Sequence, residues 1–263
     1  MTTTPTLPPF QAIADLVAGH ARARPDQVAL VQGDRKVCWA QLHAMADRVA
    51  ASLQRDGIRP GESIAICAAN SLEYVAVFLG GLRAGAAVAP LSTHSSPQQL
   101  ATMVADCGAR HFFADGAVPA FDTDARRIFM DGSAGPRLQD WLRPAGSRPT
   151  PVTVTPDAPF NIIYSSGTTG TPKGIVQPHG MRWGHVARAE SYGYGPQSVT
   201  LIATSLCSNT TLVCFFPTLA RGGTVVLAPP KFDAGRWLAL AQQHRVTHTM
   251  LVPVQYQDRK SVV

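Results

Sequence analysis

The sequence predicts an α/β protein built from two parallel-sheet units. Apolar strands alternate with amphipathic helices along most of the 263 residues, an order typical of parallel sheets with helices on both faces. A segment rich in proline and glycine, residues 131–159, predicts a linker between units at 1–130 and 160–257. With 45% apolar and only 15% charged residues, the composition is that of a compact globular protein.

The first unit opens with an amphipathic helix expected at 10–24 and two short strands at 28–32 and 36–39. The clearest helical pattern follows, with apolar residues on one face from Leu42 to Leu53 and a glycine, Gly57, beyond its end. A β-α-β-α-β order then runs to residue 114. Its expected elements are strand 63–68, helix 72–83, strand 87–91, helix 97–107 and strand 110–114.

The second unit is expected to begin with a strand at 160–164, after a linker that holds one short helix near 138–142. That strand leads directly into the stretch YSSGTTGTPKG, residues 164–174. The remaining expected elements are strand 174–177, helix 179–192, strand 199–203, helix 210–220, strand 224–227, helix 237–244 and strand 247–252.

Charge and cysteine content limit the classes of partner and compartment. The net charge is +6, but the arginines are scattered and form no basic stripe with interleaved aromatic residues. We interpret the charge as solvated surface that also attracts an anionic ligand, and we expect no nucleic-acid partner. Five cysteines lack zinc or CxxC spacing and predict buried free thiols in a reducing compartment. No signal peptide or membrane-spanning run is visible, so we expect a cytoplasmic protein without stable membrane insertion, of open oligomeric state.

The stretch from Tyr164 to Gly174 has the chemistry of a phosphate-binding loop. It combines five serine and threonine hydroxyls, three glycines and one lysine, and it contains no acid. Glycines allow backbone NH groups to converge on an anion, and Lys173 adds a compact positive charge. A Walker A loop is excluded, because the glycine-to-lysine spacing differs and no Ser or Thr follows the lysine. An ordinary Gly/Thr-rich surface loop is the alternative, which the whole ordered string disfavours.

This stretch resembles the signature loop of the AMP-forming adenylating enzymes, which include acyl-CoA synthetases, luciferases and peptide-synthetase adenylation domains. Softer similarities run in family order from Val28 to Gln257, among them NSLEYVAVFLGGLRAGAAVAPLS and RGGTVVL. The resemblance implies the stacked parallel-sheet subdomains of that superfamily's large N-terminal domain, without its small C-terminal domain. It also implies ATP, Mg²⁺ and coenzyme A: a carboxylate attacks the α-phosphate, pyrophosphate leaves, and a thiol takes the acyl group.

Matched residue by residue, the resemblance makes Thr168, Thr169 and Lys173 the phosphate contacts. Thr168 and Lys173 are also expected to stabilise the transition state. His179 lies where family members often carry a histidine, and a surface histidine at a helix N-terminus is the alternative. The nucleotide-binding residues implied by the resemblance are Ser165, Ser166, Gly167, Thr168, Thr169, Gly170, Thr171 and Lys173.

The resemblance also bears on the acid that is activated. Residues 205–208 stand where acyl-CoA ligases often read Pro-Leu-aromatic-His, with serine in place of the histidine. Amino-acid-activating relatives carry an aspartate here for the substrate ammonium, but no acid occurs between Gln197 and Ala228, which favours an aliphatic or aryl carboxylic acid. The run 210–216 either lines this pocket or, as we favour, belongs to the core. The candidate substrate-pocket residues are Ser208, Asn209 and Thr211.

Members of the superfamily extend well beyond 263 residues, and the resemblance stops after Gln257. We therefore expect an N-terminal part of a ligase, inactive in ligation by itself, with an unpaired sheet edge near Val252. The last residues, DRKSVV (258–263), are interpreted as an artefactual tail, because one possible coding of them matches a common sequencing-adapter string. A carboxylate–CoA ligase is the favoured interpretation. A peptide-synthetase adenylation domain and a non-catalytic nucleotide-binding module stay open.

Overall fold

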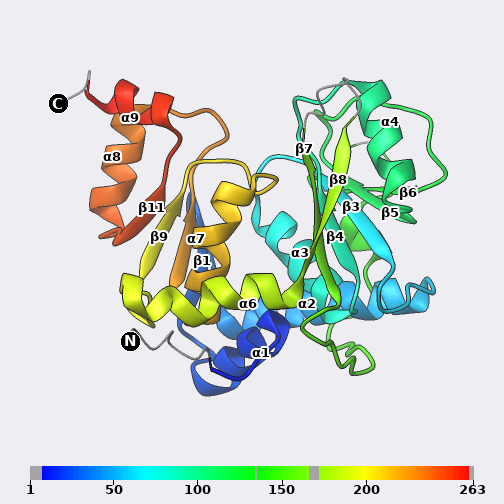
Figure 1. Ribbon diagram of the computed structural model, residues 1–263, viewed down its shortest axis with the longest axis horizontal. Helices are drawn as coiled ribbons and strands as arrows, with labels where there is room; N and C mark the ends of the chain where they lie inside the picture. Colours follow the sequence, from blue (N-terminus) through cyan, green and yellow to red (C-terminus); the bar gives the residue numbers. More distant parts are fainter. Residues whose placement is uncertain (1–7, 134, 166–171, 261–263) are drawn as a thin grey trace, which may run out of the picture.

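The structure is a computed structural model that describes residues 8–133, 135–165 and 172–260. Within these ranges the strands form two sheets, with helices between them and on their outer sides (Figure 1). The β1 sheet contains, in spatial order, β11 (His248–Met250), β9 (Val199–Ile202), β10 (Thr224–Leu227), β1 (Val28–Gln32) and β2 (Arg35–Cys38). The β3 sheet contains β6 (Arg126–Phe129), β5 (His111–Ala114), β3 (Ser63–Cys67), β4 (Ala87–Pro90), β7 (Pro159–Ser165) and β8 (Lys173–Pro178).

Neighbouring strands of the described chain run parallel, except in the edge pairs β1–β2 and β7–β8. Helices lie in the connections of most parallel pairs, whereas β5 and β6 are joined by residues 115–125 without a helix. The predicted α/β fold with two parallel-dominated sheets is therefore confirmed.

The helices form a central layer and two outer ones. The central helices share one large apolar cluster between the sheets, whereas each outer helix covers a smaller cluster on the far side of one sheet. In Figure 1 the outer helices lie at the left (α8) and right (α4) of the molecule. The central helices are α1 (Ile13–Ala23), α2 (Trp39–Arg55), α3 (Leu72–Arg83), α6 (His179–Arg188) and α7 (Asn209–Ala220). The others are α4 (Pro97–Asp106), α5 (Leu138–Trp141), η1 (Ala189–Tyr192), α8 (Ala234–Gln243) and α9 (Pro253–Lys260).

The sheets exchange strands between the two halves of the sequence. Strands β1 and β2 belong to the same sheet as β9 to β11, because Leu30 pairs with Val225 of β10. Conversely, β7 and β8 extend the sheet of β3 to β6, where Val88 pairs with Asn161. The predicted units 1–130 and 160–257 therefore do not correspond to the two sheets. Hydrophobic periodicity locates a strand but carries no information on its partner, which tertiary packing selects.

Most elements lie where the sequence predicts them, and α3, β1 and β10 have the predicted bounds. The predicted start of α4 is also confirmed: Ser96 caps the helix by accepting from the Gln99 amide, and Pro97 occupies the first turn. The structure adds β6 and α9, which the sequence analysis missed. β6 reads RRIF, so its two arginines mask the strand pattern, and α9 includes residues 258–260 of the presumed tail. Strand β11 is shorter than predicted but does form a sheet edge.

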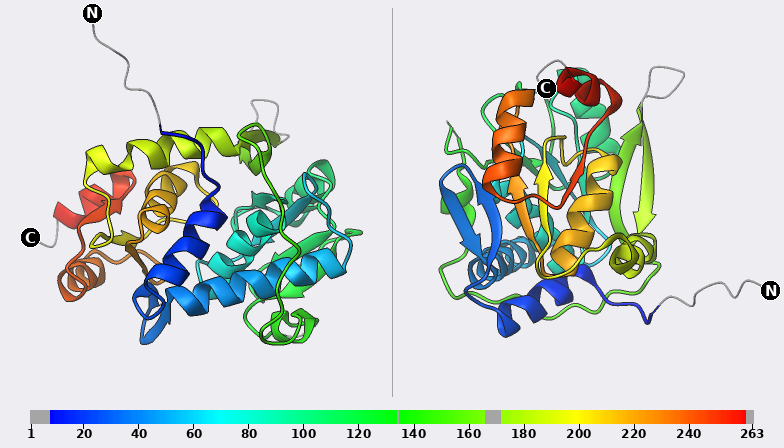
Figure 2. Two further views of the ribbon diagram at one scale, coloured as in Figure 1. Left: turned by 90° about the horizontal axis from the view of Figure 1, so that it is seen from below. Right: turned by 90° about the vertical axis from the view of Figure 1, so that its left-hand side faces the viewer.

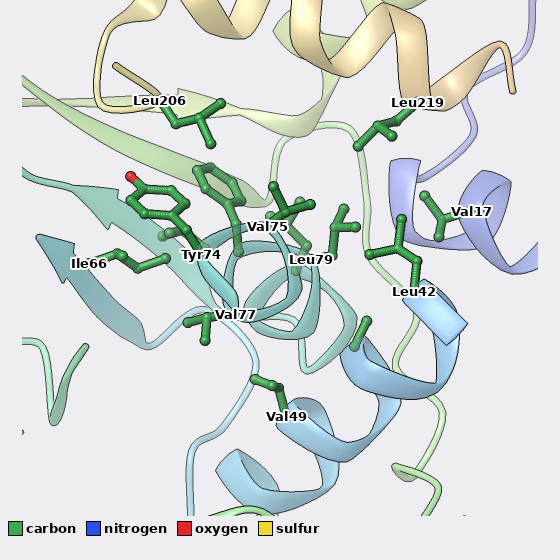
Figure 3. Close-up of a cluster of buried hydrophobic side chains, with 14 of the residues drawn as sticks. Val17, Leu42, Val49, Ile66, Tyr74, Val75, Val77, Leu79, Leu206 and Leu219 are labelled. Atoms are coloured by element: carbon green, nitrogen blue, oxygen red, sulfur yellow. The ribbon is translucent and has the colours of Figure 1, made fainter. Parts of the chain in front are cut away.

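Helix α3 lies at the centre of the molecule and approaches α2 closely. Figure 3 shows its apolar side chains pointing toward both neighbouring helices, with Val49 of α2 on one side and Leu219 of α7 on another. A Cβ atom placed on Gly80 of α3 would lie 2.4 Å from the Cβ of Val49. This helix crossing therefore requires a residue without a side chain at position 80.

All five cysteines are free, as predicted. Cys67 and Cys214 are buried, while Cys38, Cys107 and Cys207 are half-buried, so the expected full burial holds for two of them. No described helix combines the length and apolar character needed to cross a bilayer.

Candidate functional site

The candidate phosphate loop connects the two strands of the hairpin β7–β8, which stands at one side of the molecule (Figure 2). Strand β7 ends at Ser165 and β8 begins at Lys173, and these exposed residues are cross-strand partners. The structure therefore brings the first and last predicted nucleotide-binding residues together at the mouth of the loop, and Lys173 is also a predicted phosphate contact. The other predicted nucleotide-binding residues lie outside the described residues: Ser166, Gly167, Thr168, Thr169, Gly170 and Thr171.

A cavity of about 200 Å³ adjoins this mouth. It lies at the carboxyl ends of β4 and β7, the edge at which open α/β sheets bind ligands. A larger cavity, of about 960 Å³, instead adjoins His111 and Arg126 at the amino ends of their strands, and no predicted site residue lines it. We assign the site to the smaller cavity because residues on both sides of the candidate loop, Ser165 and Pro172, line it. Its lining includes Ser92, Tyr164, Ser165, Pro172 and Cys207.

One face of the hairpin packs against the end of α4. The hydroxyl of Tyr164 donates to the Asp106 carboxylate at 2.6 Å and lies 3.0 Å from the carbonyl of Met103. Burial and this hydrogen bond both raise the pKa of Tyr164. A Cβ on Gly174, the cross-strand partner of Tyr164, would lie 3.1 Å from the carboxylate of Asp106. Because Gly174 has no side chain, β8 can lie close to the Asp106 carboxylate that holds Tyr164.

The opposite face of the hairpin carries its side chains in pairs, because alternate residues of a strand point the same way. The register is unbroken from Asn161 to Ser165, so each pair lies directly across the two strands. A polar pair lies at the loop, an apolar pair follows, and an amide pair lies at the base. From loop to base the pairs are Ser165 with Lys173, Ile163 with Ile175, and Asn161 with Gln177.

The amide pair holds a buried arginine from α6, Arg182, which is only 1% exposed. Its Nε and Nη2 lie 3.2 Å from Asn161 Oδ1, and Nη2 also donates to Gln177 and, at 2.6 Å, to Asn209 Oδ1. The guanidinium lies 5.8 Å from the ring centre of Phe160. Burial lowers the pKa of Arg182 to about 10. Among the described residues no carboxylate pairs with it, and its Nη1 has no hydrogen-bond partner.

The sequence analysis missed Arg182, although helical spacing could have found it. In α6 the buried residues His179, Arg182, Trp183 and Val186 recur at the spacing of one helix face. An arginine on the buried face of a predicted helix is itself a signal of a special role, since arginine is almost never fully buried without a partner.

His179 is buried rather than exposed, so the surface interpretation is wrong. It is 3% exposed, and its ring packs edge-on against the rings of Phe10 and Phe160. Burial lowers its pKa to about 4. His179 follows the far end of β8 from Lys173, so the structure does not bring it to the loop.

The candidate substrate-pocket residues divide between surface and core. Asn209 is exposed at the start of α7 and contacts Arg182, and Ser208 before it is half-buried. Thr211 is fully buried, and its hydroxyl lies 2.7 Å from that of Thr204. Most of the run 210–216 belongs to the central apolar cluster, which confirms the core interpretation.

Between residues 158 and 232, the segment that contains the loop, the sequence has five lysine or arginine residues and one acid, Glu190. Asp106 of α4 also lies beside this segment, through its contact with Tyr164. Within the part of the chain that the structure describes, no group of three His, Cys, Asp or Glu side chains could hold a metal ion.

Comparison with known proteins shows one family and several relatives that this sequence resembles. The sequence model of a family described as AMP-binding enzyme matches residues 17–259. Phosphinothricin tripeptide synthetase PhsB of Streptomyces viridochromogenes is 32% identical over 262 residues, which cover 94% of this chain and 21% of that protein. Indoleacetate–CoA ligase of Aromatoleum aromaticum is 28% identical over 260 residues, covering 92% and 50%. The chain thus spans half of the ligase and about a fifth of the synthetase.

A solved structure shows the same fold with a nucleotide bound. O-succinylbenzoate coenzyme A synthetase (MenE) from Bacillus subtilis, in complex with AMP, superposes with a TM-score of 0.84 at 25% sequence identity. The match covers 96% of this chain and 51% of that one.

Proposed function

The chain belongs to the AMP-binding enzyme family, and we propose that it is the nucleotide-binding part of an enzyme that activates a carboxylic acid with ATP. The acid's carboxylate attacks the α-phosphate, pyrophosphate leaves, and the acyl group passes from the adenylate to the thiol of coenzyme A. The chain covers half of a relative that is a CoA ligase, so the whole reaction belongs to a longer protein in this proposal.

The loop residues bind the triphosphate through positive charge and through hydrogen bonds. Lys173, which the structure places at the mouth opposite Ser165, supplies positive charge to the β- and γ-phosphates. Thr168 and Thr169 donate hydroxyl hydrogen bonds to the same phosphates. These donors act most strongly as charge develops on the departing pyrophosphate, so they lower the barrier. Mg²⁺ bound with ATP supplies further neutralisation of the triphosphate. Ser165, Ser166, Gly167 and Gly170 shape the loop in this proposal, and Thr171 adds a further hydroxyl donor.

One observation carries the choice of a CoA ligase over an amino-acid-activating domain. No acid occurs between Gln197 and Ala228, the stretch that contains the start of α7. An α-ammonium group would find no carboxylate to pair with in this stretch. An acid without an amino group therefore fits better.

Pyrophosphate exchange tests this proposal. The chain, and in parallel the longest reading frame that contains it, is incubated with ATP, labelled pyrophosphate and a panel of aliphatic, aryl and amino acids. We expect exchange with acids that lack an amino group and none with amino acids. Exchange only with an amino acid would support the second candidate, an adenylation domain of a peptide synthetase, which the similarity to PhsB favours. ATP binding without any exchange by the longer protein would indicate a non-catalytic nucleotide-binding module.

A further inference from the structure

Arg182 is a buried cation whose charge no described group neutralises. Its partners are the neutral amide oxygens of Asn161, Gln177 and Asn209. Two donors in the same cluster, Arg182 Nη1 and Asn161 Nδ2, are buried and have no hydrogen-bond partner within the described chain. Unfilled buried donors are rare in folded proteins and point to a missing acceptor. Because the cluster holds a positive charge and two donors without partners, it favours an acceptor that carries a negative charge.

One partner of Arg182 in this cluster lies at the surface. Asn161 and Gln177 are buried, whereas Asn209 is exposed and its Oδ1 accepts from Arg182 Nη2. A ligand oxygen that displaces the Asn209 carboxamide would take its place at Arg182 Nη2. Cys207, which lines the cavity beside the loop, is only two residues away in sequence.

The hairpin face connects this cluster to the phosphate loop. From Ser165 to Asn161 the strand spans about 13 Å, since each residue of a strand advances by about 3.3 Å. The apolar pair Ile163 and Ile175 lies between the two polar ends, and Ile175 is 52% exposed. The face thus offers a cation at the loop, an apolar middle and a second cation at the base.

We propose that this face binds the acyl chain of a dicarboxylic acid. One carboxylate is activated at the loop, the methylene chain crosses Ile163 and Ile175, and the distal carboxylate replaces Asn209 at Arg182. This inference rests on the proposed function and adds the substrate class to it. A distal methyl group would leave Arg182 without a negatively charged partner, whereas a distal ammonium group would be repelled.

A pair of matched probes tests the proposal on the 263-residue chain. The probes are undecanedioyl and dodecanoyl sulfamoyl adenosines, which mimic acyl-adenylates, differ only at the distal end and are long enough to extend from the loop to Arg182. Calorimetric titration should show at least about tenfold tighter binding of the undecanedioyl probe, the range of one charge-assisted hydrogen bond. Arg182→Met should bring the two affinities within a factor of about three. Arg188→Met removes an exposed arginine from the same helix and should retain the preference.

Asn209→Ala supplies a test that does not depend on the core, because Asn209 is exposed. Removing the competing carboxamide should tighten undecanedioyl binding and leave dodecanoyl binding at its wild-type value. Equal affinities of the wild-type chain for both probes, or a preference for dodecanoyl, would overturn the proposal while the proposed function stands. If neither probe binds to a chain that circular dichroism shows to be folded, the proposed function is contradicted. The proposed substrate class, which rests on it, is then contradicted as well.

Discussion

The hydroxyl of Tyr164 lies 2.6 Å from the carboxylate of Asp106, and this contact ties the strand before the phosphate loop to the end of α4. The two residues are 58 positions apart in sequence. On the opposite face of the same hairpin, Arg182 joins β7 and β8 to the start of α7. The hairpin β7–β8 is therefore contacted on both of its faces by other segments of the chain.

Removing the Tyr164 hydroxyl should loosen this support. We expect Tyr164→Phe to lower the free energy of unfolding by about 1 kcal/mol, the usual net value of one hydrogen bond when the partner, here the exposed Asp106, can turn to water. Urea denaturation measures the change. Tyr192→Phe, at a tyrosine that is 72% exposed, is the control and should be neutral. Equal effects of the two variants would show that the contact with Asp106 adds no stability.

Two glycine-to-alanine substitutions in helices should have opposite signs. Gly80→Ala places a methyl group against Val49 and should destabilise the protein by about 2 kcal/mol or more through overpacking. Gly19→Ala in α1 meets no atom within 4 Å and should stabilise it by about 0.5–1 kcal/mol, because alanine is the better helix former. Thermal unfolding of both variants checks the prediction, which a stabilising Gly80→Ala would contradict.

The burial of His179 should make stability depend on pH between about 6.5 and 4. Burial lowers its pKa to about 4 from 6.5, so within this window the unfolded chain binds a proton that the folded chain does not. Stability from the neutral imidazole is full above pH 6.5 and is lost as the pH falls toward 4. At pH 5 the loss is about 2 kcal/mol, at 1.36 kcal/mol per pH unit.

His179→Gln should remove this component, so that its urea midpoint changes less between pH 7 and pH 5 than that of the wild type. His94→Gln, at an exposed histidine, should leave the pH dependence as it is. An unchanged pH dependence in His179→Gln would show that His179 titrates in the folded protein as it does in the unfolded chain.

Asp56 should contribute in the acid range. Burial opposes its ionisation, but hydrogen bonds from Arg55, Trp141 and His111 outweigh burial and hold the pKa of Asp56 well below its usual value. A folded-state pKa below the unfolded one stabilises the protein above about pH 4, and this stability is lost as the pH falls further.

We expect Asp56→Asn to cost about 2–3 kcal/mol at pH 7, because it removes a charged acceptor from several donors at once. The difference from the wild type should shrink between about pH 4 and 2, the range below the usual carboxyl pKa. Asp124→Asn, at an exposed aspartate, is the control for urea titrations across this range. A constant difference at every pH would mean that the lost stability comes from packing rather than from the charge.

The sequence predicted most of the fold because its helices and strands carry strong periodicity, as in α3 and β1. It could not predict that β1 would join β10 and that β7 would join β4, because partner choice depends on the packing of helices such as α3 between the sheets. The sequence did reveal the candidate loop, because the residues that give it its phosphate-binding character are consecutive. Tyr164 with Asp106, and Arg182 with Asn209, are contacts between distant segments and carry no local signature.

The central claim is that the loop after β7 holds the triphosphate of ATP, and calorimetric titration of ATP with Mg²⁺ into the 263-residue chain tests it most directly. We expect saturable binding to the wild type and at least about tenfold weaker binding when Thr168, Thr169 and Lys173 are all alanine, since in the proposed function each provides a hydrogen bond to a phosphate. Lys36→Ala removes an exposed strand lysine from the other sheet and should bind as the wild type does. Wild-type affinity in the triple variant would contradict the account.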